Sequence, residues 1–285
     1  MINNDTFQRF LFEDLQIRGE WVRLGNSFQE ATDSLNYPSA IKSLLGQTIA
    51  ASVLLTGTLK FAGRLSIHAR GQGPVSLLTA ETTNLRHFRA LAKWEGDIGS
   101  ELDLKALLGD AQLAITIDPD KGTRYQGIVP MEKDNLSECL EHYFELSEQL
   151  DTHLLLGAND DACYGLLLQK LPDYKKIEDQ DAWNRVVHLA KTISQDELLK
   201  ADNETLVTRL FHQEEVILYP SEPVLFECGC SEERSLSAIH GLGEQEALDI
   251  LEKEAVIAMN CQFCGACYQF DRSDIQKLFK LDPIQ

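Results

Sequence analysis

The end of the chain carries cysteines in two close pairs, Cys228-Gly229-Cys230 and Cys261-Gln262-Phe263-Cys264. Two pairs of thiolates joined by one long loop are the donor set of a structural, tetrahedral zinc site. Gly229 and Gly265 suit the tight turns that direct sulfur toward a metal. The spacing predicts one zinc ion per chain, and a thiol cluster without zinc or an iron–sulfur site is the alternative. The predicted zinc ligands are Cys228, Cys230, Cys261 and Cys264.

The same spacing suits redox chemistry. Cys261 and Cys264 can be bridged with little movement, and Cys228 and Cys230 can be bridged under some strain. Peroxide or hypochlorite converts a thiolate to a sulfenic acid, which a neighbouring thiol converts to a disulfide. A disulfide removes metal ligands, so oxidation would lead to loss of the metal and to local unfolding. Spacing alone leaves two interpretations open, an inert zinc ribbon and a redox switch.

The elements around the cysteines form a small terminal module, residues 216–285. Residues 245–251 and 274–279 have helical patterns, and Tyr268-Gln269-Phe270 follows the last cysteine. The module has few large apolar side chains, and so short a piece rarely folds by core burial alone. Binding of zinc to such a site contributes roughly 10–16 kcal/mol at neutral pH, so we expect the metal to fold the module.

Residues 1–172 are predicted to form a mixed sheet-and-helix domain, which makes the chain an α+β protein. Alternating apolar residues and glycine-rich turns predict two hairpins, over residues 63–79 and 113–129. Short strands are predicted at residues 21–24 and 164–170, and a helix at residues 137–150. A long apolar helix opens at Pro38. Residues 41–59 are the best candidate for a membrane span, but their Lys, Gln, Ser and Thr side chains favour a buried core helix.

Residues 173–215 form a predicted helical linker of different character. The segment is charged and lacks glycine, and its apolar residues from Ala182 to Ile193 recur at helical spacing as a narrow stripe. Ser194 and Asn203 are predicted N-caps of two shorter helices. Because the segment encodes no large core, it must pack against other parts of the chain or fray.

Composition narrows the function. The 285 residues carry a formal net charge of −19, which argues against nucleic acid and anionic membranes as partners. The start of the chain lacks a basic and an apolar signal region, so a cytoplasmic location is expected. Clustered cysteines in a reducing compartment more often bind metal than form permanent disulfides. The chain has no GxSxG, GxxxxGK[ST] or HExxH motif, so we expect no enzyme activity.

The paired cysteines, taken with motifs along nearly the whole chain, resemble the heat shock protein 33 family, the redox-regulated holdase chaperones of bacteria. Motifs similar to the N-terminal domain of that family are Trp21-Val22-Arg23-Leu24, Gly71-Gln72-Gly73-Pro74, Arg124-Tyr125-Gln126-Gly127 and Ser147-Glu148-Gln149-Leu150. His212-Gln213-Glu214-Glu215-Val216 resembles the junction before the family's zinc module.

The resemblance implies a mechanism. The reduced, zinc-bound form is expected to have little activity. Oxidation is expected to form the disulfides Cys228–Cys230 and Cys261–Cys264 and to release zinc. The module and the linker then unfold, and the protein binds unfolding client proteins without ATP. The resemblance also implies a homodimer in the oxidised state.

Three further cysteines and one histidine need separate predictions. Cys267 departs from the family pattern and could compete as a ligand or divert disulfide pairing, but Cys264 is expected in the site because it completes the matched pair. Cys139 is expected to be a small buried hydrophobe, and Cys163 is given no role. His240 is expected at the surface, because four thiolates already complete the site.

Three functional classes remain: a stress-activated holdase, a constitutive zinc-module adaptor that binds one fixed protein partner, and a thiol oxidoreductase. The oxidoreductase is the weakest of these, because no thioredoxin-like βαβ pattern surrounds Cys261 and Cys264. For the holdase, clients are expected on apolar surface of the freed linker and of the domain beneath it. The predicted linker residues are Trp183, Val186, Val187, Leu206 and Phe211.

Overall fold

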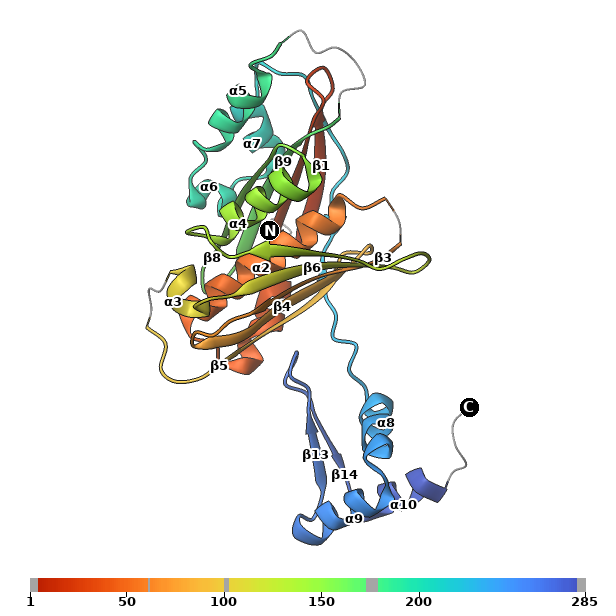
Figure 1. Ribbon diagram of the computed structural model, residues 1–285. Helices are drawn as coiled ribbons and strands as arrows, with labels where there is room; N and C mark the ends of the chain where they lie inside the picture. The colour runs from red at the N-terminus through yellow and green to blue at the C-terminus, as the bar shows by residue number, and fades with distance from the viewer. Residues whose placement is uncertain (1–4, 61, 100–102, 173–178, 281–285) are drawn as a thin grey trace. The chain divides into compact units, whose positions relative to one another are not determined.

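The structure is a computed structural model that describes residues 5–60, 62–99, 103–172 and 179–280 (Figure 1). The chain divides into two compact units, Met1–Glu227 and Cys228–Gln285. Both units combine helices with mainly antiparallel strands, which confirms the predicted α+β class.

The first unit is built around two six-stranded sheets. Sheet 1 has the order β10-β1-β2-β9-β8, with β11 also paired to β1, and sheet 2 has the order β12-β5-β4-β3-β6-β7. The predicted hairpins are β3–β4 and β6–β7, whereas β1, β5 and β8 were not predicted from the sequence. The strands are β1 (Thr6–Phe12), β2 (Ile17–Leu24), β3 (Gly63–Arg70), β4 (Val75–Thr83), β5 (His87–Trp94), β6 (Gln112–Pro119), β7 (Tyr125–Pro130), β8 (Thr152–Ala158), β9 (Cys163–Lys170), β10 (Val216–Leu218), β11 (Glu222–Pro223) and β12 (Leu225–Phe226).

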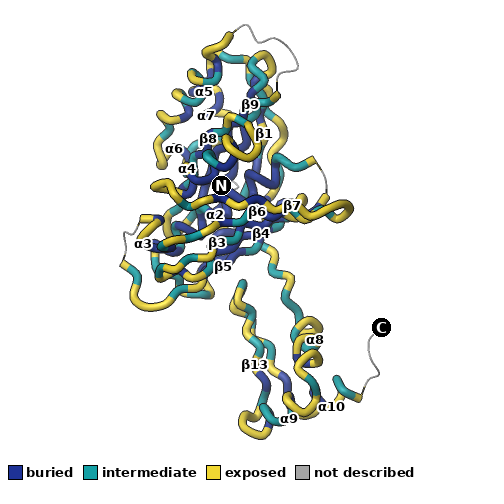
Figure 2. The backbone as a smooth tube through the Cα atoms, in the orientation of Figure 1, coloured by how far each residue is buried: buried dark blue, intermediate teal, exposed yellow. Residues whose placement is uncertain are grey.

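The long apolar helix is α2 (Ser39–Gly57), which begins after Pro38 and contacts strands of both sheets. By length and composition it could cross a membrane, but 83% of its most apolar window is buried among other residues of the protein. Figure 2 shows it as a buried segment at the centre of the first unit. The prediction of a core helix is therefore confirmed.

Shorter helices complete the main domain. The helix predicted over residues 137–150 is α4 (Leu136–Tyr143), which continues as the π-helical turn η2 (Phe144–Glu148). Gln149 ends this turn in the left-handed region, with φ 54°. The remaining helices of this part are α1 (Asn26–Thr32), η1 (Asp33–Leu35) and α3 (Leu104–Leu108).

The linker forms a layer of three helices on the face of sheet 1 opposite α2, and we call it the linker layer. It consists of α5 (Ala182–Ala190), α6 (Gln195–Lys200) and α7 (Asn203–Leu210). Successive strand residues point to opposite faces, so alternate residues of sheet 1 contact α2 or the linker layer. The linker-side apolar residues of the sheet are Phe10, Phe12, Ile17, Trp21, Tyr164, Leu166 and Leu168. The layer covers them with Val186, Ala190, Leu198, Leu206, Val207, Leu210 and Phe211.

Polar contacts anchor the linker layer where α6 ends. Arg23, 3% exposed, donates from Nη1 to the carbonyls of Ala201 at 2.6 Å and Leu199 at 3.3 Å. A cation at a helix C-terminus satisfies carbonyls that lack an intrahelical partner. Burial lowers the pKa of Arg23. Asn203 Nδ2 donates to Gln8 Oε1 at 2.7 Å.

One of the two predicted N-caps is correct. Ser194 caps α6, and it forms a capping box with Glu197. The prediction for Asn203 is wrong, because Asp202 caps α7 and accepts from the Thr205 amide at 2.8 Å. Asp and Asn are about equally favourable at an N-cap, and α7 is capped by Asp202, the earlier of these two neighbouring residues.

Residues 216–227, which we call the strap, follow the linker layer. The strap pairs with β1 through β10 and β11, and with β5 through β12. It therefore belongs to the first unit, and the second unit begins at Cys228 rather than at residue 216. The division into parts of distinct function (1–172, 173–215 and 216–285) stays a prediction, and residues 173–178 lie outside the described residues.

The second unit is a hairpin packed with three helices. The helices are α8 (Glu232–Leu242), α9 (Glu244–Lys253) and α10 (Arg272–Lys280), and the hairpin joins β13 (Ile257–Asn260) to β14 (Cys267–Phe270). The helical patterns at residues 245–251 and 274–279 are confirmed as parts of α9 and α10, whereas α8 was not predicted. A small core holds the unit together: Ile239, Ala247, Leu251, Ile257, Phe270 and Ile275.

Candidate metal centre

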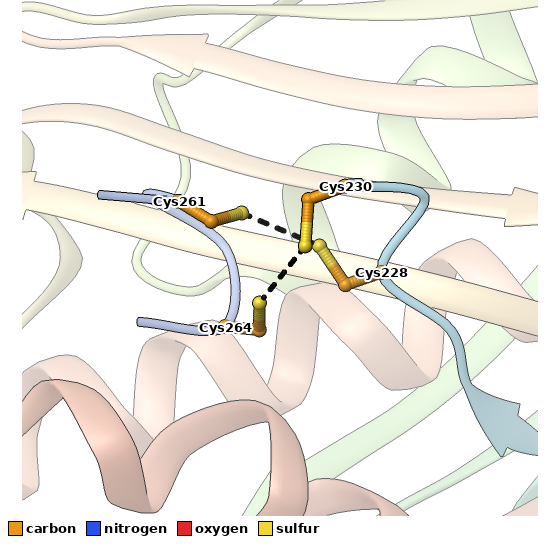
Figure 3. A group of neighbouring side chains, drawn as sticks. All are labelled: Cys228, Cys230, Cys261 and Cys264. Carbon is orange, nitrogen blue, oxygen red and sulfur yellow. Dashed lines mark hydrogen bonds between the residues drawn. The ribbon is translucent and has the colours of Figure 1, made fainter. Parts of the chain in front are cut away.

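Two loops of the second unit bring four sulfur atoms together (Figure 3). Cys228 and Cys230 lie on the segment before α8, and Cys261 and Cys264 lie in the turn between β13 and β14. The four Sγ atoms all lie within 4.8 Å of one another. The Cys228–Cys261 and Cys230–Cys264 sulfur pairs are both 3.4 Å apart.

Backbone geometry explains how each loop presents its sulfurs. The Gly265 amide donates to the Cys261 carbonyl at 2.9 Å, and the Cys261 amide donates to the Ala266 carbonyl at 2.8 Å. Gly265 has φ 72°, a left-handed conformation that glycine adopts without a steric penalty. In the other loop, Arg234 at the start of α8 donates from Nη1 to the Gly229 carbonyl.

The four sulfurs fit a tetrahedral metal ion. With zinc–sulfur bonds of about 2.3 Å, a tetrahedral site places its sulfurs about 3.8 Å apart. The observed separations, 3.4 Å for two pairs and at most 4.8 Å for all, are close to that value. A set of four thiolates selects zinc or an iron–sulfur cluster over hard cations. The four cysteines can therefore hold a metal ion, and the assignment of zinc belongs to the proposal below.

The thiols of the cluster have unequal acidity. The Tyr268 hydroxyl lies 3.3 Å from Cys230 Sγ, and its hydrogen bond lowers the pKa of Cys230 to about 7. The same interaction raises the pKa of Tyr268 to about 12. Burial raises the pKa of Cys228 and of Cys264. Cys230 is thus the cysteine that the protein itself favours as a thiolate, the form that binds metals and reacts with oxidants.

Sequence reasoning missed Tyr268 and Arg234 as parts of this site. Tyr268 lies on β14 just after the cysteine turn, and the hairpin register pairs it with Met259. Its hydroxyl reaches Cys230 only because the other loop folds over the hairpin, and no spacing in the sequence indicates that contact. Arg234 follows Cys230 by one helical turn, a proximity that the undetected α8 concealed.

The remaining cysteines and His240 are not members of the four-sulfur cluster. Cys267 is exposed and does not belong to the group of four sulfurs. Cys139 is 1% exposed, which confirms the prediction of a buried side chain. Cys163 is also buried, and burial raises the pKa of both thiols. His240 is exposed, as predicted, and stacks on Phe279 with ring centroids 5.1 Å apart.

Comparisons with known proteins identify relatives along nearly the whole chain. A family model described as "Hsp33 protein" matches residues 5–271. A relative from Ectopseudomonas mendocina named "33 kDa chaperonin" is 46% identical over 281 residues, which cover 97% of this chain and 95% of the relative. A relative of the same name from Hahella chejuensis is 47% identical over 277 residues, which cover 96% of this chain and 97% of the relative. The chain belongs to the Hsp33 family.

Membership of the Hsp33 family confirms the resemblance drawn from the sequence motifs. The crystal structure of a 33 kDa chaperonin, an Hsp33 homologue from Thermotoga maritima, matches with a TM-score of 0.85. The match covers 98% of this chain and 100% of that chain at 20% identity. At that identity the likeness shows that the two proteins share the Hsp33 fold.

In this Hsp33 chain the predicted client-binding residues all lie in the linker layer. Val186, Leu206 and Phe211 are buried against sheet 1, whereas Trp183 and Val187 are half-buried. The geometry of the four sulfurs does not select a disulfide pairing, because every pair lies within 4.8 Å. The pairing Cys228–Cys230 and Cys261–Cys264, and the client role of the five linker residues, stay predictions.

Proposed function

We propose that this chain is an ATP-independent holdase chaperone whose activity is controlled by the redox state of a zinc centre formed by Cys228, Cys230, Cys261 and Cys264. Three observations support the proposal. Its relatives are named chaperonin. Its four thiols are close enough both to bind one ion and to form disulfides. The linker layer covers a large apolar face of sheet 1.

Oxidation acts on the sulfurs themselves. Each disulfide joins two cysteines, which together lose two protons and two electrons. Hypochlorous acid accepts two electrons and one of the protons, and yields chloride and water. The proposed products are Cys228–Cys230 and Cys261–Cys264, and neither disulfide retains a thiolate for the metal. When bound, the metal ion supplies a cross-link between the two loops, so oxidation removes the cross-link.

The second unit depends on that cross-link. Its core contains six buried apolar residues, few for a unit of this length. Loss of a zinc site removes a stabilisation of roughly 10 kcal/mol, more than such a core supplies. The unfolded unit continues directly into the strap at Cys228, and the strap continues into α7. Oxidation is thus proposed to weaken the linker layer through the chain itself.

Release of the linker layer would uncover a binding surface. Beneath it lie Phe10 and Phe12 of β1, Trp21 of β2, and Leu166 and Leu168 of β9, each at most 2% exposed in the docked state. A contiguous apolar surface of this kind binds the apolar segments that unfolding proteins expose. The net charge of −19 keeps the protein soluble while that surface is open. The single observation that carries the proposal is this apolar face beneath the linker layer.

The decisive experiment compares the reduced and oxidised protein. Zinc content and free thiols are measured before and after treatment with hypochlorite, and suppression of the aggregation of a model client is measured in parallel. We expect one zinc per reduced chain, loss of four thiols and of the zinc on oxidation, and suppression only by the oxidised form. Equal suppression before and after oxidation, with zinc retained, would instead support a constitutive adaptor.

A matched pair of variants tests which cysteines matter. Cys264→Ser removes a member of the cluster, whereas Cys267→Ser removes an exposed cysteine outside the cluster. We expect Cys267→Ser to retain the zinc and the oxidation-dependent gain, and Cys264→Ser to lose both. If Cys267→Ser also prevented the gain, disulfide formation would involve Cys267 and the proposed pairing would be wrong.

The proposed client contacts of the linker have their own test. The double variant Trp183→Ser, Phe211→Ser removes two of the largest apolar side chains of the layer. If the linker contacts clients directly, the oxidised variant should suppress aggregation less well than the oxidised native protein. Unchanged suppression would assign client binding to the sheet beneath.

A further inference from the structure

Within the described part of the chain, short pieces of the strap are what covers the outer edge of β1. β10 contributes three residues, with Leu11 opposite Ile217 and Phe12 opposite Val216, and β11 contributes two. Residues 219–221 separate these pieces and include Pro220. Proline has no amide hydrogen to donate to a neighbouring strand. The edge of β1 therefore has a weak covering strand.

The two halves of the strap are anchored differently. Among residues 216–221 none is buried, and Ile217 and Tyr219 are 40% and 42% exposed. In the second half Val224 is fully buried, and its carbonyl accepts from Ser27 Oγ at 3.1 Å. Glu222 pairs with Arg9 at 2.8 Å. The second half thus has its own anchors.

The first half depends on the linker layer instead. Two residues before the strap, Glu214 pairs with Arg185 of α5 at 2.7 Å. Val216 and Leu218 pack on the apolar cluster that the linker layer completes, in which Phe211 lies 4.9 Å from Phe12 between ring centroids. When the linker layer leaves, the first half of the strap loses these contacts and is expected to leave with it.

Departure of β10 frees backbone groups as well as apolar side chains. The Tyr219 amide donates to the Arg9 carbonyl at 2.9 Å, so the backbone of Arg9 points toward the strap. Every second residue of an antiparallel strand directs its N–H and C=O to the same neighbouring strand. The N–H and C=O of Leu11, two residues after Arg9, therefore also point toward the strap. The side chains of Phe10 and Phe12 lie beside that edge, on the linker-side face. The same strand thus offers hydrogen bonds and apolar contact together.

We propose that oxidation opens the outer edge of β1, and that an extended apolar segment of an unfolding protein adds there as a new strand. In the docked state β10 occupies this edge, as an extended Val-Ile-Leu segment that runs antiparallel to β1. A client segment that fits the edge should therefore also be extended and apolar. A client strand in its place continues the apolar face of sheet 1 that the linker layer uncovers. Main-chain hydrogen bonds give affinity without sequence selectivity, as a holdase requires. This inference rests on the proposed function and names the class of client segment that it binds.

The test uses a fluorescent peptide with the sequence of residues 212–221 as the probe and the oxidised full chain as its receptor. In one version the amides of Ile217 and Tyr219, which face β1, are N-methylated. In the matched version the amides of Val216 and Leu218, which face away, are N-methylated. We expect the first change to weaken binding about tenfold or more, because two hydrogen bonds are lost. The second change should weaken it less than about twofold.

A protein variant provides the reciprocal measurement. Leu11→Pro removes the amide hydrogen that points to the strap, at a position near the edge where proline is tolerated. The oxidised variant should bind the unmodified peptide about fivefold or more weakly, with its zinc content in the reduced state unchanged. If the variant did not fold, the peptide pair alone would decide.

The outcomes separate this inference from the function on which it rests. If the oxidised native protein failed to suppress aggregation, the proposed function would be overturned. If it suppressed aggregation and bound both methylated peptides equally, strand addition would be overturned and the function retained. If the oxidised chain instead formed a dimer that the unmodified peptide did not disrupt, the edge would belong to a second copy and the inference would be wrong.

Discussion

The two units of this protein are stabilised by different means. In the first unit, α2 is buried between two six-stranded sheets in a continuous apolar core, and the linker layer adds a second core on the far side of sheet 1. In the second unit six buried residues support one hairpin and three helices, and four sulfurs lie where a metal ion would join the two loops. The first unit thus relies on apolar burial, whereas the second has a small core and four cysteines that can hold a metal ion.

Under the proposed function, this difference lets one chain contain both a stable client-binding surface and a removable cover. Burial of apolar area does not depend on redox state, so β1, β2, β8 and β9 of sheet 1 are expected to keep their form when the cysteines are oxidised. A unit that a metal ion folds loses its structure when its ligands change. The linker layer precedes the second unit in sequence and contributes to the core of the first unit. The free energy that holds the linker layer on sheet 1 therefore sets how readily the proposed binding surface opens.

Removal of the metal is the change with the largest expected effect. Chelation, or the variant Cys261→Ser, should unfold the second unit, because roughly 10 kcal/mol of binding free energy is lost. Hydrogen exchange should show complete loss of protection in α8, α9 and the β13–β14 hairpin, while α2 and β9 stay protected. Cys267→Ser is the matched control and should leave protection unchanged, since Cys267 lies outside the cluster. Protection of the hairpin in the metal-free variant would show that the two units do not differ as described.

Truncation of Phe211 should loosen the contact between the linker layer and sheet 1 without changing the cysteines. Phe211 is 2% exposed and packs edge-on against Phe12. Replacement of a buried phenylalanine by alanine costs about 3–5 kcal/mol. In the reduced protein, Phe211→Ala should therefore increase hydrogen exchange in α5–α7 and give some client binding, with zinc retained. Trp183→Ala, at a half-buried position, should have a smaller effect; equal effects would mean that burial does not hold the layer in place.

A buried carboxyl group gives the first unit a pH dependence of its own. Glu20 is 1% exposed, and burial raises its pKa to about 7 from an ordinary value of 4.5. Between these values the folded state binds more protons than the unfolded state, so stability falls as pH rises through this window. The fall amounts to about 3 kcal/mol. Glu20→Gln should remove this fall in the free energy of unfolding, as measured by urea unfolding of the first unit at pH 5 and pH 8. Glu13→Gln, at an exposed position, is the control, and an unchanged pH profile in Glu20→Gln would contradict the assignment.

Much of the fold could be predicted from local patterns. Period-two alternation located β3, β4, β6 and β7, and uniform apolarity identified α2 as a core helix. The strand β1 was missed because Arg9 and Gln8 interrupt its aromatic residues, which point to opposite faces of sheet 1. The pairing of the strap with β1 could not be predicted, because it spans about two hundred residues of sequence and local patterns carry no such information.

Local sequence patterns identified the residues of the candidate site more completely than they identified the fold around it. Thiolates bind metals in close pairs, so spacing alone brought Cys228, Cys230, Cys261 and Cys264 together, and the structure places their sulfurs within 4.8 Å. Tyr268 could not be found in this way, because its contact with Cys230 depends on how the two loops fold over each other. The apolar face beneath the linker layer was only partly foreseen, since the sequence showed the stripe on the linker and not the sheet that it covers.

The smallest expected effect comes from the cap of α6, and it tests whether the linker layer is stabilised locally as well as by burial. Ser194 accepts from the Glu197 amide, and Glu197 accepts in return from the Ser194 amide at 2.9 Å. Ser194→Ala should weaken α6 by about 1 kcal/mol and raise its hydrogen-exchange rate about fivefold. Ser194→Asp keeps an oxygen acceptor at the same position and should leave the rate nearly unchanged. Because α6 carries the carbonyls that Arg23 binds, a fivefold rise confined to α6 would show that the layer opens helix by helix. The same rise across α5, α6 and α7 would show that the layer opens as one cooperative unit.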